Sequence, residues 1–121
     1  MGFHIESNEK KNAAMIRVEG DVDMYTSPSL RDALVPFFTK NVMAVVVDLS
    51  RVSFMDSSGI ATLVEGLQWS RKQGRQFILA GLGDTVSNAL SLTKLDNVFT
   101  IHKNADQVFA SITRENQGKK T

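Results

Sequence analysis

The side chains with the most evident chemistry in this sequence stand together in the segment Asp56-Ser57-Ser58. They follow a β-branched run and precede residues with helical periodicity, so they are expected at the N-terminus of a helix. Carboxylate and hydroxyl oxygens accept hydrogen bonds from the free amides of a first helical turn, and capping alone would explain these residue types. A second interpretation is that the Ser57 hydroxyl accepts a phosphoryl group, which would add about −1.5 to −2 charges beside Asp56.

Such a phosphate would act on a bound partner more than on the fold. The amides of a helix N-terminus tolerate an anion, whereas a partner docked over Ser57 would have to bury a dianion. An uncompensated buried charge costs about 3 to 5 kcal/mol, which weakens binding roughly a hundredfold to a few thousandfold. The segment is therefore either a simple helix cap or an electrostatic switch on protein association.

Nine elements are predicted to position this segment. Strands are expected near residues 3–5, 14–18, 42–49, 77–80 and 98–101, and helices near 28–38, 57–73, 84–90 and 104–112. The first two strands form an antiparallel hairpin around a turn at 6–12, and Gly20 ends the second strand. The run at 42–49 is apolar on both faces, as a central strand covered on two sides requires. Strand–helix alternation then predicts that the later strands are parallel.

Several local signals refine these elements. Ser27-Pro28 predicts a hydroxyl N-cap followed by proline at the first helical position. Pro36 should kink or shorten that helix near Asp32, because it removes one backbone donor. Residues 50–56 are expected to form a loop, and Gly66 inside the next helix indicates close approach by another backbone.

Length and composition predict one α/β domain with a mixed sheet and about four helices. The chain has 121 residues, and we expect the domain to cover residues 1–115 and a flexible tail to cover 116–121. The absence of cysteine excludes disulfides, thiolate metal sites and thiol nucleophiles. With 14 basic and 13 acidic residues the net charge is +1, which argues against nucleic acid as a partner.

No segment has the character of a membrane span or a signal peptide. The longest apolar run, Val42 to Val47, has six residues, whereas a bilayer requires roughly 20. The first twelve residues contain no apolar core of the length found in signal peptides. The expectation is a cytoplasmic protein without direct membrane insertion.

Two other classes of chemistry fit the sequence less well than serine phosphorylation does. A receiver-like aspartyl phosphoacceptor would need clustered carboxylates for Mg²⁺ and a nearby lysine, for which the candidates are Asp21, Asp23, Asp48 or Asp56, and Lys103. The predicted initial hairpin is wrong for that fold. A hydrolase is disfavoured because the sequence contains no Gly-x-Ser-x-Gly elbow.

Several blocks of the sequence together resemble a single-domain STAS protein of the bacterial anti-sigma-factor antagonist family. The blocks are Gly20-Asp-Val-Asp23, Val47-Asp-Leu49, Val52-Ser-Phe-Met-Asp-Ser-Ser-Gly59 and Leu92-Thr-Lys-Leu-Asp96. The resemblance covers about residues 3 to 112 and implies a STAS-like fold. One departure is Gly59-Ile60-Ala61, where the family often continues Gly-Leu-Gly.

The resemblance implies that Ser57 is the phosphoacceptor. In that family a partner anti-sigma factor is also the serine kinase, and a PP2C-type serine phosphatase reverses the reaction. The unmodified protein binds the anti-sigma factor and frees a sigma factor, and the modified protein dissociates. ATP and Mg²⁺ belong to the kinase, so the chain itself is expected to need no cofactor and to be no enzyme. The alternative within the resemblance is an accessory STAS subunit of a membrane transporter, such as an ABC-type lipid transporter.

The residues expected to contact the partner lie on two segments, and they are Asp23, Met24, Tyr25, Asp56, Ser58 and Gly59. The position of Asp23 matches a family position beside the acceptor serine. Met24, Tyr25, Phe54 and Met55 either cap the end of the sheet or form an adaptable interface, and the sequence leaves both open.

Overall fold

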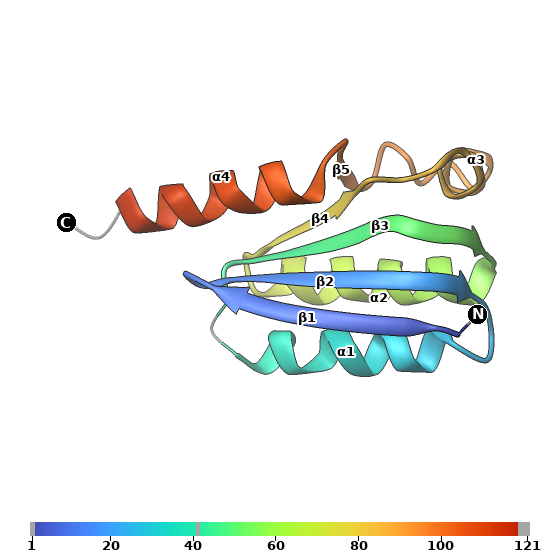
Figure 1. The fold of residues 1–121 in the computed structure, drawn as a ribbon, viewed down its shortest axis with the longest axis horizontal. Coiled ribbons are helices and arrows are strands. Elements are labelled where there is room, and N and C mark those ends of the chain that lie inside the picture. Colours follow the sequence, from blue (N-terminus) through green and yellow to red (C-terminus); the bar gives the residue numbers. More distant parts are fainter. Residues whose placement is uncertain (1, 41, 119–121) are drawn as a thin grey trace.

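Five strands form one mixed sheet in the spatial order β1-β2-β3-β4-β5 (Figure 1). The computed structural model describes residues 2–40 and 42–118. The strands are β1 (His4–Lys10), β2 (Ala13–Val22), β3 (Ala44–Met55), β4 (Gln76–Ala80) and β5 (Thr100–His102). The β1–β2 pair is antiparallel and the other three pairs are parallel, which confirms the predicted topology.

Four helices cover the sheet, as predicted. They are α1 (Ser27–Thr39), α2 (Ser57–Lys72), α3 (Asp84–Leu92) and α4 (Ala105–Gly118). Apolar side chains of α1, α2 and α3 pack into one core on one face of the sheet, and α4 packs into a second, smaller core on the other face. None of the helices within the described residues is long and apolar enough to cross a bilayer.

The middle strand β3 lies where the sequence places it, but it is longer than expected. Its first half is buried on both faces, as two-sided covering requires. The predicted loop at 50–56 is wrong, because β3 continues to Met55. This second half of β3 is largely exposed, and its polar residues are of the types that are common in loops. The prediction that Gly20 ends β2 is also wrong. Gly20 adopts a φ of +108° inside an irregularity of the β2–β3 register between Glu19 and Asp21, and β2 continues until Val22 pairs with Met55.

The hairpin turn is much tighter than the predicted one at 6–12. β1 extends to Lys10, and only Lys11 and Asn12 form the turn, with φ values of 53° and 65°. Positive φ at both central residues is the geometry of a two-residue hairpin turn. The second half of β1 is polar and exposed on both sides, so no alternation of apolar residues marks it as a strand.

Helix α1 differs from its prediction at both ends. Its N-cap is Thr26 rather than Ser27, with no hydrogen bond from the cap side chain, and Pro28 lies in the first turn as predicted. Pro36 does not shorten the helix, which continues to Thr39, because Phe37 and Phe38 remain packed in the core beyond it.

Two further local predictions have mixed outcomes. A Cβ added to Gly66 would lie 2.7 Å from the Phe77 ring, so an aromatic side chain approaches this glycine rather than another backbone. Asn104 caps α4 as predicted, since its Oδ1 accepts the Gln107 N–H at 2.9 Å.

Helix α4 runs to Gly118, past the predicted start of the tail at residue 116, and residues 119–121 of that tail lie outside the described residues.

Candidate functional site

The segment Asp56-Ser57-Ser58 connects the C-terminal end of β3 to the first turn of α2, as the sequence predicted (Figure 1). Asp56 is the N-cap of α2, and Ser57 is the first helical residue. The Asp56 N–H donates to the Val22 carbonyl oxygen at 3.0 Å, which fixes the helix tip beside the end of β2. The loop that starts at Asp23 therefore lies next to the helix tip.

Asp56 is bound tightly into the cap of α2. Its Oδ1 accepts the Ser58 N–H at 2.9 Å, the Ser58 hydroxyl at 2.6 Å and the Gly59 N–H at 3.4 Å. The Ser58 hydroxyl, followed by the amides of Ser58, Gly59 and Met24, lowers the pKa of Asp56, while desolvation opposes this shift. Because a carboxyl group with a lowered pKa is ionised at neutral pH, Asp56 places a negative charge at the helix tip.

The two adjacent serines have different surroundings. Ser57 is exposed, and its hydroxyl makes no hydrogen bond to any described residue. Ser58 is half-buried, and its hydroxyl is committed to Asp56. Of the two hydroxyls, that of Ser57 is the one open to an incoming reactant.

Asp23 organises its own loop. Its Oδ1 accepts the N–H groups of Tyr25 at 2.9 Å and Thr26 at 3.1 Å. The Thr26 hydroxyl accepts the Asp23 N–H at 2.9 Å and donates to the Asp21 carbonyl oxygen at 2.8 Å. Within the described residues, neither Asp23 nor Asp56 forms an ion pair.

Three of the four apolar residues around the site are on the surface. Met24 is 66% exposed, Tyr25 83% and Phe54 46%, whereas Met55 is only 3% exposed and belongs to the core. The Met24 amide acts on the Asp56 carboxylate, which places the loop at Met24 next to the helix tip, and Phe54 lies two residues before Asp56 on β3. We define the Ser57 surface as Met24, Tyr25, Phe54 and Ser57.

Gly59 lies beneath the Ser57 surface and is buried. A Cβ at this position would lie 2.6 Å from Met55 Cγ and 2.7 Å from Val22 Cγ1, so only glycine lets α2 start this close to the strand ends. Two residues depart from the family pattern after Gly59. Ile60 is buried, and Ala61 is exposed.

We expect Gly59→Ala to destabilise the protein by about 1 to 2 kcal/mol, because the added methyl overpacks the junction of α2 with the strands. Urea unfolding followed by circular dichroism measures this. Gly2→Ala is the control, since a Cβ there meets nothing within 4 Å and the residue lies outside every helix and strand. Equal unfolding free energies for the two variants would contradict the packing role of Gly59.

We expect Ser58→Ala to raise the pKa of Asp56 toward its ordinary value, because the Ser58 hydroxyl is the largest cause of the shift. A folded-state pKa below the unfolded one contributes stability that is present above the unfolded pKa and is lost as pH falls through the folded pKa. Ser58→Ala should therefore reduce this contribution. Carboxyl ¹³C NMR titration reads the pKa directly, and Ser57→Ala should leave it unchanged.

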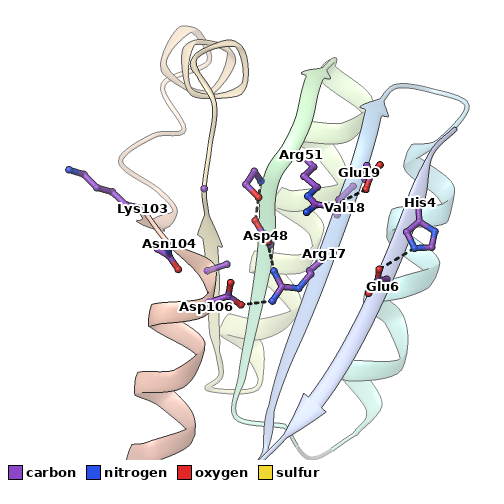
Figure 2. Close-up of a pocket in the computed structure, with 13 residues that line it drawn as sticks. His4, Glu6, Arg17, Val18, Glu19, Asp48, Arg51, Lys103, Asn104 and Asp106 are labelled. Atoms are coloured by element: carbon purple, nitrogen blue, oxygen red, sulfur yellow. Dashed lines mark hydrogen bonds and ion pairs between the residues drawn. The ribbon is translucent and has the colours of Figure 1, made fainter. Parts of the chain in front are cut away.

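The cavity on the α4 side of the sheet is a separate feature. It has a volume of about 420 Å³, and Ser57 does not line it. Figure 2 shows Arg17 at its floor, bound to Asp48 at 2.8 Å and to Asp106 at the start of α4. These contacts raise the pKa of Arg17 above its usual value, with the Asp106 hydrogen bond as the largest cause. Arg51 at the cavity wall pairs with Glu19 at 3.4 Å.

The carboxylates considered for a receiver-like phosphoacceptor site make separate interactions. Asp48 binds Arg17, Asp21 accepts the Ser53 hydroxyl at 3.0 Å, and Asp56 caps α2. Lys103 points away from Asp48 in Figure 2. Among residues 2–40 and 42–118, no group of three or more His, Asp or Glu side chains is placed to hold a metal ion.

Sequence reasoning missed Thr26, whose hydroxyl links Asp21 and Asp23 in the loop beside the helix tip. A signal was present in the spacing Asp23-x-x-Thr26, because Asp and Thr side chains bond to backbone groups a few residues away.

The fold and the site define a small α/β domain that presents a free serine hydroxyl at a helix tip, next to a loop with exposed apolar residues. Residues 4–108 match the STAS domain family, and the chain belongs to this family. The anti-sigma-B factor antagonist of Listeria monocytogenes is 31% identical over 102 residues, which cover 84% of this chain and 90% of the relative. The protein of the same name from Staphylococcus aureus is 24% identical over 106 residues, covering 88% of this chain and 98% of that protein.

The fold also matches solved structures. The crystal structure of an anti-sigma factor antagonist from Mycobacterium paratuberculosis superimposes with a TM-score of 0.81 at 24% identity, and the match covers 91% of this chain and 93% of the other. At this identity the likeness supports the fold alone.

Proposed function

We propose that this chain is an anti-sigma factor antagonist whose binding is switched by phosphorylation of Ser57. The unmodified chain binds an anti-sigma factor that is also a serine kinase, and this binding frees a sigma factor. Phosphorylation of Ser57 ends the complex, and a PP2C-type serine phosphatase restores the binding form. The chain is then the substrate of the kinase and a binding module.

One observation carries this proposal: the Ser57 hydroxyl is exposed and free of hydrogen bonds to described residues, and the adjoining loop and strand end carry the exposed side chains of Met24, Tyr25 and Phe54. A hydroxyl in that state can enter a kinase active site without loss of a bond. Exposed Met and Tyr side chains are typical of protein interfaces. The names of the relatives, which are anti-sigma-B factor antagonists, support the same role.

The test uses the full chain and an anti-sigma factor kinase from the same host. The two purified proteins are mixed with ATP and Mg²⁺, and intact mass followed by fragmentation locates the modification. We expect one phosphate, on Ser57. A chain that stays unmodified would contradict the proposal. Recovery of the chain from host extracts with a transporter permease and no anti-sigma factor would replace it with the transporter role.

A further inference from the structure

We infer that Asp56 determines which of two adjacent serines is phosphorylated, because it retains the Ser58 hydroxyl in the helix cap and leaves the Ser57 hydroxyl free. This inference rests on the proposed function and concerns the regulation of the same site. Ser57 and Ser58 are chemically identical and consecutive, so an active site that accepts one of them is only one residue away from the other.

The geometry separates the two hydroxyls. The Ser58 Oγ lies 2.6 Å from Asp56 Oδ1, and the Ser58 side chain is half-buried. The Ser57 hydroxyl has no such bond and faces solvent. A kinase that took Ser58 would first have to break a hydrogen bond to an ionised carboxylate. Such a bond favours Ser57 by a factor on the order of ten to a hundred.

Asp56 has little freedom to release Ser58. The oxygen that accepts the Ser58 hydroxyl also accepts the amides of Ser58 at 2.9 Å and Gly59 at 3.4 Å. The Asp56 backbone N–H is bound to Val22 at 3.0 Å. Rotation of the carboxylate away from Ser58 would therefore leave two amides of the first helical turn uncapped.

A carboxylate next to a serine can also act as a general base, which would favour Ser58. Here the bonds that hold Asp56 lower its pKa, and a carboxylate with a lowered pKa is a weaker base. The Ser58 hydroxyl is thus held by Asp56 rather than activated by it. Asp56 is in this sense a positioning residue, and its effect is on the choice of serine.

The experiment measures the ratio of the two singly phosphorylated products in one chain. Wild type, Asp56→Asn and Asp56→Ala are each incubated with the same anti-sigma kinase, ATP and Mg²⁺, and fragmentation mass spectrometry quantifies phosphate on Ser57 and on Ser58. We expect the share of Ser58 to rise at least about tenfold in Asp56→Ala. Asp56→Asn should fall between the two, because its amide oxygen still caps the helix but carries no charge. Weaker docking of a variant would lower both products and leave their ratio unchanged.

Asn104→Ala is the matched control, because it removes the side-chain cap of α4 on the other face of the sheet. It should give the wild-type ratio. If both Asp56 variants keep that ratio while wild type is modified on Ser57, the inference is wrong and the proposed function stands. If wild type takes no phosphate on Ser57, the proposed function fails, and this inference fails with it.

Discussion

The chain phosphorylated on Ser57 is expected to bind its anti-sigma factor at least about a hundredfold more weakly than the unmodified chain. A partner that docks over the helix tip and the Met24 loop covers Ser57, and it would bury the phosphate. The first turn of α2 offers that charge only partial compensation. Asp56 already accepts the amides of Ser58 and Gly59, so these groups are not free for the phosphate.

Asp56 strengthens this effect, because its lowered pKa keeps it ionised and adds a like charge beside the phosphate. The sequence alone indicated that the helix amides would tolerate the new charge. In the structure two of those amides, of Ser58 and Gly59, donate hydrogen bonds to Asp56. The phosphate is therefore expected to remain exposed to solvent when the chain is unbound.

Two substitutions separate the charge from the loss of the hydroxyl. Ser57→Ala should keep the complex intact in the presence of ATP, because no phosphate can be added. Ser57→Asp should weaken binding by less than phosphorylation does, since it adds only one charge. Isothermal titration calorimetry measures both. Ser111→Asp introduces the same charge at an exposed position on α4 and should bind like wild type. Equal affinities for wild type, Ser57→Ala and Ser57→Asp would rule out the electrostatic switch.

The topology of the sheet could be predicted because its central strands are buried and their sequence shows it. The run at 42–49 and the alternation at 14–18 both correspond to strands. The same reasoning failed in the second halves of β1 and β3, where the strands are largely exposed. Backbone pairing holds these segments in the sheet, and backbone pairing leaves no pattern in the side chains.

The candidate site could be predicted only in part. The position of Asp56-Ser57-Ser58 at a helix tip follows from N-cap chemistry. The contrast between the two serines depends on one side-chain hydrogen bond, which residue types do not specify. The cluster of Arg17, Asp48 and Asp106 was out of reach for a different reason, since its members are 31 and 89 residues apart in the chain.

That cluster leads to the second large prediction, which concerns stability. Arg17→Met should reduce the free energy of unfolding by about 2 to 3 kcal/mol, less than for a fully buried pair because Arg17 is partly exposed to solvent. The Asp48 side chain is only 10% exposed, and its Oδ2 loses its partner in the variant, while its Oδ1 still accepts the Ser50 N–H at 3.0 Å. Urea unfolding measures the loss.

The two carboxylates of the cluster should respond differently, because only one of them is removed from water. Asp106 is 71% exposed, so Asp106→Asn breaks its contact with Arg17 at a cost of about 1 kcal/mol or less. Replacing both members of the buried pair, in Arg17→Met with Asp48→Asn, should recover part of the stability lost in Arg17→Met, since no unpaired charge remains inside. Asp48→Asn alone also lowers the free energy of unfolding of the wild type by some amount. If it lowers that of Arg17→Met by the same amount, the two residues act independently. In that case packing of the Arg17 stem, rather than its charge, would account for the stability lost in Arg17→Met.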